Sequence, residues 1–148
     1  MRLLDTLSPS GGEGINKLVD VLQNAMRLAP AQKKHPKHLL FFTSSAVSQK
    51  AADEFLGRLS QRKKDQVKPV TNETIQAQAI AITKWGSSDS TSLSAITQPV
   101  LIANGDHDIM VPSINSWSLF QKLPNAILSI FPDAGHGGIF QYHEVFVP

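Results

Sequence analysis

Residues 99–112 read PVLIANGDHDIMVP, and residues 131–139 read FPDAGHGGI. The first stretch begins with a continuous apolar run, which is typical of a buried parallel strand. The second stretch ends another short apolar run, AILSIF at 126–131. A loop rich in Gly, Asp and His follows each predicted strand. Because catalytic groups gather where parallel strands end, the two loops are predicted to lie close together.

The chain before these strands is predicted to be mostly helical. Residues 2–8 form a predicted short strand, and PSGGEG at 9–14 interrupts regular structure. Apolar spacing then predicts helices over 15–29, 46–62 and 72–85, followed by helices over 114–122 and 138–147. The predicted order is strand, three helices, strand, helix, strand, helix. This order favours a parallel α/β sheet of about three strands with right-handed crossovers.

The same spacing predicts the caps and the buried faces of these helices. Ser44 or Ser45, Thr71 or Asn72, and Ser113 are suited to cap the helices that follow them. Pro30 and the polar run after it are predicted to end the first helix. The predicted buried faces consist of Ile15, Leu18, Leu22 and Met26 in the first helix, Val47, Ala51, Phe55, Leu56 and Leu59 in the second, and Ile75, Ala79 and Ile82 in the third.

The composition of the chain excludes several classes of protein and several kinds of site. The 148 residues suit one domain with a buried core, and the net charge is only +2. The chain has no cysteine, which excludes disulfides and thiolate metal sites and fits a reducing compartment. No apolar run reaches the length of a membrane span, and the N-terminal run is too short for a signal peptide, so we expect a soluble cytoplasmic protein. The basic clusters at 33–37 and 62–64 lack interleaved aromatic residues, and no nucleic-acid partner is expected.

Asp108 and His136 are the candidate catalytic residues. Asp108 lies in the loop after the first buried strand, where a carboxylate can orient a histidine and stabilise its protonated form. His136 follows the second strand between glycines, and a histidine there can exchange a proton with a nucleophile. The alternatives are a turn aspartate that bonds its own backbone and an ordinary surface histidine.

The sequence also contains candidates for other kinds of site. A metal site would draw on Asp106, His107, Asp108, His136 and His143, but they lack a recognised ligand spacing, so no metal is predicted. The glycine-rich stretch 11–14 is read as a turn rather than an anion nest. His35 and His38 are predicted to be solvated in a basic loop. No cofactor is expected.

These motifs resemble the α/β-hydrolase superfamily. Residues 99–112 look like the seventh strand and acid loop of that family, with Gly105, Asp108, Val111 and Pro112 matching its usual form. Residues 126–138 look like the eighth strand and histidine loop, so the resemblance implies Asp108 as the acid and His136 as the base. The chain order, acid before histidine, agrees with the family. Residues 2–8 resemble the sixth strand.

The resemblance also implies a domain organisation. The chain is expected to be a single truncated α/β-hydrolase-like domain over 1–148, with cap helices at about 11–90 and the acid and histidine loops within 97–148. The first five strands, the oxyanion-hole loop and the Gly-x-Ser-x-Gly elbow have no counterpart in the sequence. Ser44 and Ser45 lack flanking glycines and fall in the cap.

Three functional hypotheses follow. The chain is a hydrolase-like protein of an ester-cleaving family, inactive by itself because the serine nucleophile is absent. Alternatively, it is a non-catalytic module that binds a ligand or a protein, or it is half of an enzyme that another chain completes. The expected partners are a small ester-type substrate and either a second copy of the chain or the missing N-terminal half. An unpaired strand edge would favour such association.

Overall fold

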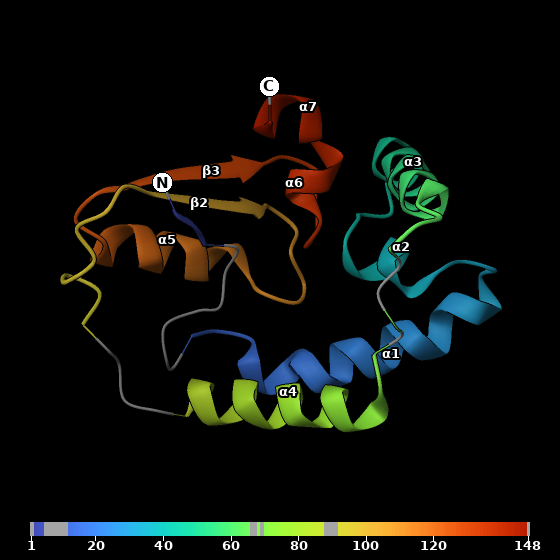
Figure 1. The fold of residues 1–148 in the computed structure, drawn as a ribbon, viewed down its shortest axis with the longest axis horizontal. Coiled ribbons are helices and arrows are strands. Elements are labelled where there is room, and N and C mark those ends of the chain that lie inside the picture. The colour runs from blue at the N-terminus through green and yellow to red at the C-terminus, as the bar shows by residue number, and fades with distance from the viewer. Residues whose placement is uncertain (1, 5–11, 66–67, 69, 88–91, 148) are drawn as a thin grey trace.

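The computed structural model describes residues 2–4, 12–65, 68, 70–87 and 92–147. A small parallel sheet and its covering helices form one part of the fold, and a second group of helices lies beside them (Figure 1). Among the described residues, no helix is both long and apolar enough to cross a bilayer.

The sheet contains three parallel strands, as the sequence predicts. β1 (Arg2–Leu4) pairs with β2 (Val100–Gly105), and β2 pairs with β3 (Ala126–Phe131), so β2 lies in the middle. The register places Leu3 beside Leu101 and Leu101 beside Ile127. The last four residues of the predicted first strand, 5–8, lie outside the described residues.

β2 is buried almost throughout, because helices lie on both of its faces. α5 (Ser113–Lys122) packs on one face, where Leu119 and Leu123 contact Val100 and Ile102. On the other face, α6 (Gly138–Gln141) and α7 (His143–Phe146) cover Ala103 and Phe131. This double covering explains why the strand reads as a continuous apolar run.

The second group consists of η1 (Ile15–Lys17), α1 (Leu18–Ala31), α2 (Pro36–Leu40), α3 (Ala46–Gln61) and α4 (Asn72–Gly86), and we use the word cap as a label for residues 15–86. α1 and α4 lie along each other below the sheet, whereas α2 and α3 lie beside α6 (Figure 1). Ser45 and Thr71 cap α3 and α4, as predicted.

The structure differs from the predicted helices at three places. α1 continues through Pro30 to Ala31, and α2 is an additional short helix that starts with a proline. The predicted helix over 138–147 is divided at Tyr142, whose ring stacks on Phe131 and whose hydroxyl donates to the Pro132 carbonyl at 2.9 Å. These contacts hold the chain where the helical geometry is interrupted.

The predicted cap at Ser113 is also wrong. Ser113 is the first residue of α5, and its hydroxyl donates to the Gly105 carbonyl at 2.7 Å instead of accepting from the helix. Pro112 occupies the N-cap position. The hydroxyl therefore ties the start of α5 to the end of β2.

All three predicted buried faces need correction. Ile75 is 52% exposed, and α4 has no buried residue. Met26 is 63% exposed, whereas Ala25 and Ala29 are the buried residues of α1. Val47 is 72% exposed and Leu59 is 48% exposed, whereas Ser48, Ala52 and Phe55 are buried in α3. Small side chains let these helices pack closely, so the contacting faces are displaced from the stripes of large residues.

Candidate active site

Asp108 follows β2 and is buried, with a side chain that is 0% exposed. Its Oδ1 accepts hydrogen bonds from the backbone N–H groups of Met110 at 2.8 Å and Val111 at 2.9 Å. This is the turn geometry expected of an aspartate that bonds its own loop. The other carboxylate oxygen, Oδ2, is directed out of the turn. Asp108 can therefore be a turn residue and also the carboxylate that orients a histidine.

Asn104 supports the acid loop from within the sheet. It is only 2% exposed, and its Nδ2 donates to the Val111 carbonyl at 2.9 Å and to the Ser116 hydroxyl at 3.2 Å. Its Oδ1 accepts from the Gly105 N–H at 2.8 Å. The loop that carries Asp108 is therefore held to both β2 and α5. The sequence prediction missed Asn104, although a polar residue inside an apolar strand is a recognisable signal.

The structure brings His136 to Asp108, as the strand order predicts. The His136 Nδ1 lies 2.8 Å from the Asp108 Oδ2, and the imidazole is 22% exposed. An ionised carboxylate only accepts hydrogen bonds, so the Nδ1 carries the shared proton. In the neutral ring, Nε2 is then the nitrogen with the lone pair. This is the tautomer that a histidine base requires.

Glycines permit the close approach of three segments around His136. A Cβ on Gly105 would lie 2.2 Å from the carbonyl oxygens of Ala134 and Gly135. A Cβ on Gly137 would lie 2.8 Å from the Cβ of Phe41. Backbone of the acid loop, the histidine loop and the cap therefore pack directly on one another.

The cap contacts His136 through Phe41. The two rings are 5.3 Å apart between centroids in an edge-on arrangement, and the Gly137 N–H donates to the Phe41 carbonyl at 2.8 Å. Phe42 forms an antiparallel bridge with Ala134. The cap thus forms part of the support of the histidine, a role that the sequence does not reveal.

The other candidate metal ligands are not gathered around this pair. Asp106 bonds His107 at 2.6 Å, and His143 bonds the Phe140 carbonyl at 3.2 Å. Within the described residues, no group of three or more His, Asp or Glu side chains is placed to hold a metal ion.

Asp106 and His107 influence each other's pKa. Partial burial acts to raise the pKa of Asp106, but hydrogen bonds from His107 and from the backbone of Ala134 and Asp133 outweigh it and lower the pKa. The hydrogen bond and charge of Asp106 raise the pKa of His107. Asp106 also accepts from the Ala134 N–H at 3.2 Å, so it helps to join the acid and histidine loops.

The prediction that His38 is solvated is wrong. It is 8% exposed, and its Nε2 lies 2.9 Å from the Asp53 Oδ1, whereas its Nδ1 contacts the His35 carbonyl at 3.2 Å. His35 caps α2 by accepting from the Lys37 N–H. Both histidines therefore hold α2 in place.

Ser45 accepts a hydrogen bond from the Ser48 N–H and donates its hydroxyl to Asp133. It serves the cap and the histidine loop, and Ser44 is exposed. Gly14 has a left-handed φ of 85° next to Pro112, which accounts for that glycine as a turn residue.

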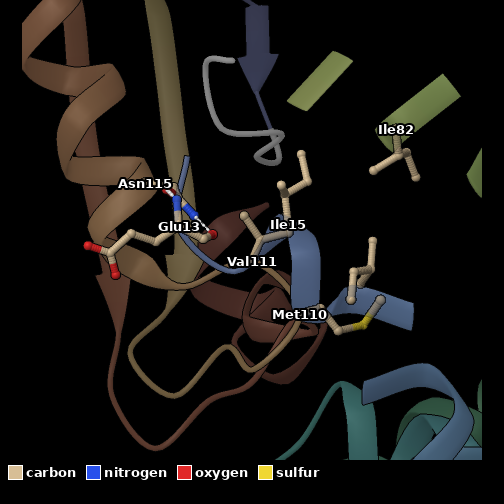
Figure 2. Close-up of a pocket in the computed structure, with 7 residues that line it drawn as sticks. Glu13, Ile15, Ile82, Met110, Val111 and Asn115 are labelled. Atoms are coloured by element: carbon tan, nitrogen blue, oxygen red, sulfur yellow. Dashed lines mark hydrogen bonds between the residues drawn. The ribbon is translucent and has the colours of Figure 1, made fainter. Parts of the chain in front are cut away.

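An apolar pocket connects the acid loop to the cap (Figure 2). Met110 and Val111 line it from the acid loop, and Ile15 and Ile82 line it from the cap. At its edge, Glu13 and Asn115 exchange two hydrogen bonds of 2.8 Å through the Glu13 backbone. The pocket therefore lies beside the residues that orient Asp108.

The comparisons with known proteins agree with this geometry. The family described as "alpha/beta hydrolase fold" matches residues 17–141. An alpha/beta hydrolase fold protein from Chitinophaga pinensis is 34% identical and superposes with a TM-score of 0.89 over 99% of this chain and 54% of its own. A thermophilic esterase from Thermogutta terrifontis, at 17% identity, shares the fold with a TM-score of 0.53 over 97% of this chain and 51% of its own.

A curated relative is the pimeloyl-[acyl-carrier protein] methyl ester esterase of Nitrosomonas europaea. It is 36% identical over 55 residues, which are 37% of this chain and 22% of the relative. The chain thus spans about half the length of the solved relatives and a smaller share of the curated one. The matched residues and the parallel sheet assign the chain to the α/β-hydrolase fold family.

Proposed function

We propose that this chain carries the acid and histidine part of an ester-hydrolysing site, with Asp108 orienting His136. The 2.8 Å contact between the Asp108 Oδ2 and the His136 Nδ1 is the observation that supports this assignment most directly. The esterase relatives support an ester as the bond that is cleaved.

The proposed chemistry requires a nucleophile. His136 would accept the proton of a serine hydroxyl as that oxygen attacks the ester carbonyl, and would then donate the proton to the leaving alcohol. Asp108 would stabilise the imidazolium that forms between these steps. The 148 residues contain no Gly-x-Ser-x-Gly motif, and Ser45 bonds Asp133. We therefore propose that the isolated chain is inactive on esters and that a nucleophile reaches the site from another segment.

The domain organisation is part of the proposal. Residues at about 11–90 act as the cap over the site, and residues 97–148 carry the two catalytic loops. The apolar pocket between the cap and Met110 supports an acyl or alkyl group as the part of the substrate that the cap contacts. Association with a second copy or with an N-terminal half would cover the β1 edge, which pairs only with β2 among the described strands.

A chimera tests the function. The part of the Chitinophaga relative that this chain does not match is fused in front of residue 1, and hydrolysis of short p-nitrophenyl esters is measured. We expect hydrolysis by the chimera and none by the isolated chain. His136→Ala is expected to abolish the activity, whereas His143→Ala, which changes an exposed histidine, is expected to leave it unchanged.

Three outcomes would contradict the proposal. They are hydrolysis by the isolated chain above that of its His136→Ala variant, equal activity of the chimera and its His136→Ala variant, and a folded chimera without activity. The last result would favour a non-catalytic binding module.

A further inference from the structure

A ring of hydrogen bonds joins the cap to the histidine loop. The carboxylate of Asp133 accepts from the Thr43 hydroxyl at Oδ1 and from the Ser45 hydroxyl at Oδ2, both at 2.5 Å. The Ser48 hydroxyl accepts from the Thr43 N–H at 2.9 Å and donates to the Gln141 Oε1 at 2.7 Å. The Gln141 Nε2 donates to the Asp133 carbonyl at 3.0 Å and closes the ring. We call these five residues the Asp133 clamp.

Asp133 has an unusual backbone for a residue with a side chain. Its φ is 51°, in the left-handed region, which Asp tolerates better than most residues. A strained conformation persists when its surroundings determine it, and here both carboxylate oxygens and the carbonyl oxygen are bound. The hydroxyl donors Ser45 and Thr43 lower the pKa of Asp133, so it is ionised at neutral pH and can accept from both.

Asp133, the residue at the centre of the clamp, precedes His136 in the histidine loop. Ala134 bridges Phe42, and the His136 N–H donates to the Leu40 carbonyl at 3.4 Å. The Phe41 ring then contacts the imidazole. The cap segment 40–45 therefore follows the histidine loop from Asp133 to Gly137, with the clamp at one end and the Phe41 contact at the other.

The acid loop holds the histidine loop from another side. The His107 N–H donates to the Ala134 carbonyl at 2.9 Å, and the Asp106 carboxylate accepts from the Ala134 N–H. The position of His136 thus depends on contacts with two separate segments. Loosening the cap contacts would remove one of these two attachments.

We propose that Asp133 is a positioning residue for His136. By accepting the Thr43 and Ser45 hydroxyls, it fixes the cap segment 40–45 on the histidine loop and keeps the imidazole bonded to Asp108. The importance of this clamp for catalysis rests on the function proposed above, whereas its effect on the His136–Asp108 hydrogen bond does not.

The test measures that hydrogen bond in the isolated full chain. In histidine labelled with ¹⁵N, the proton on the His136 Nδ1 is observed by NMR, and its exchange with solvent is measured at neutral pH. Asp108→Asn identifies the signal by removing it. In Thr43→Val/Ser45→Ala we expect exchange about tenfold faster, or loss of the signal, because the clamp has lost both of its hydroxyl donors to a charged group.

Matched variants separate positioning from general destabilisation. Thr71→Ala removes the hydroxyl that caps α4, as Ser45→Ala removes the one that caps α3, but Thr71 does not contact Asp133. We expect Thr71→Ala to leave the exchange rate unchanged. Thr43→Val alone is expected to accelerate exchange, and Thr43→Ser, which restores a hydroxyl, is expected to return it to the original rate.

The proposal is overturned if the exchange rate is unchanged in the folded double variant, or if Thr71→Ala accelerates exchange equally. If the double variant does not fold, Thr43→Val and Thr43→Ser decide the question, and equal rates in these two overturn it. None of these measurements needs a nucleophile. A chimera without esterase activity would therefore contradict the proposed function and leave this inference standing.

Discussion

Asp108 uses its two carboxylate oxygens for different tasks. Oδ1 accepts from two backbone N–H groups of its own loop, and Oδ2 contacts His136. The two hydrogen bonds to Oδ1 hold the carboxylate in the orientation that directs Oδ2 at His136.

Asp108→Asn tests the task of Oδ2. The amide can still accept from the loop through its oxygen, but its NH₂ group would face His136 and favour the wrong imidazole tautomer. In the esterase chimera we expect kcat to fall by about 10⁴-fold, the effect known for this change in a serine protease.

Asp53→Asn is the control for this substitution, because Asp53 pairs with His38, a histidine outside the candidate site. We expect less than a twofold change in kcat. Similar losses in the two variants would contradict a specific role for Asp108.

The ionisation of Asp133 should appear in the pH dependence of stability. Hydroxyl donors lower its pKa in the folded chain below the value of an unfolded aspartate, about 3.9. Its contribution to stability is therefore present above about pH 4 and is lost as the pH falls through the lower, folded pKa. We expect urea unfolding at several pH values to show a smaller acid-induced loss of stability in Thr43→Val than in the parent chain.

Thr83→Val is the control for that measurement, because the Thr83 hydroxyl donates to the Ala79 carbonyl of its own helix at 2.9 Å. Its acid-induced loss should match that of the parent. A loss in Thr43→Val equal to that of the parent would argue against a bond between Thr43 and an ionised Asp133.

At the level of whole elements, the parallel strands were the most predictable part of the fold. The run at 99–103 is continuous and apolar because helices cover both sides of β2. The run at 126–131 forms β3 as predicted, although only Phe131 of that strand is buried. Because parallel strands end at the same edge of a sheet, their order predicts that Asp108 and His136 lie close together. The hydrogen bond between these two residues confirms that juxtaposition.

The cap was less predictable. Large apolar residues suggested the buried face of α3, but Ser48 and Ala52 are buried and Val47 is exposed. The buried Ser48 hydroxyl bonds Thr43 and Gln141, and Gln141 lies 93 positions after Ser48 in the chain. Helical periodicity reports local spacing only, so it could not reveal a partner in the histidine loop.

Gly105→Ala tests the close packing at the end of β2. The new Cβ would lie 2.2 Å from two backbone oxygens of the histidine loop, so the backbone must move. We expect a loss of about 1–3 kcal/mol in the free energy of unfolding, together with weakening of the His136–Asp108 bond.

Gly57→Ala is the matched control, because a Cβ at this position in α3 meets nothing within 4 Å. Alanine in a helix should stabilise it by about 0.5–1 kcal/mol, as measured by urea unfolding. If Gly105→Ala and Gly57→Ala change the free energy of unfolding in the same direction, this interpretation of the packing at Gly105 is wrong.

At the scale of the whole molecule, the sheet is small and incompletely covered. Ile127 of β3 lies beside Leu101 and is 66% exposed, whereas the alternate residues of these strands pack against α5. The chain superposes on 54% of the Chitinophaga protein, so that relative contains further chain beyond the matched part. Exposed apolar surface combined with an open strand edge favours association.

We therefore expect the isolated chain to self-associate, most simply as a dimer, at micromolar concentration. Pairing through the β1 edge or covering the face around Ile127 would remove unpaired backbone groups and apolar surface from water. Light scattering should give a mass above that of one chain, 16.1 kDa. Ile127→Lys is expected to reduce this mass if the open face takes part, whereas Val47→Lys, at a similarly exposed position on α3, should leave it unchanged. A monomer mass with a single cooperative thermal transition would mean that one chain protects its own edge, and self-association would then be wrong.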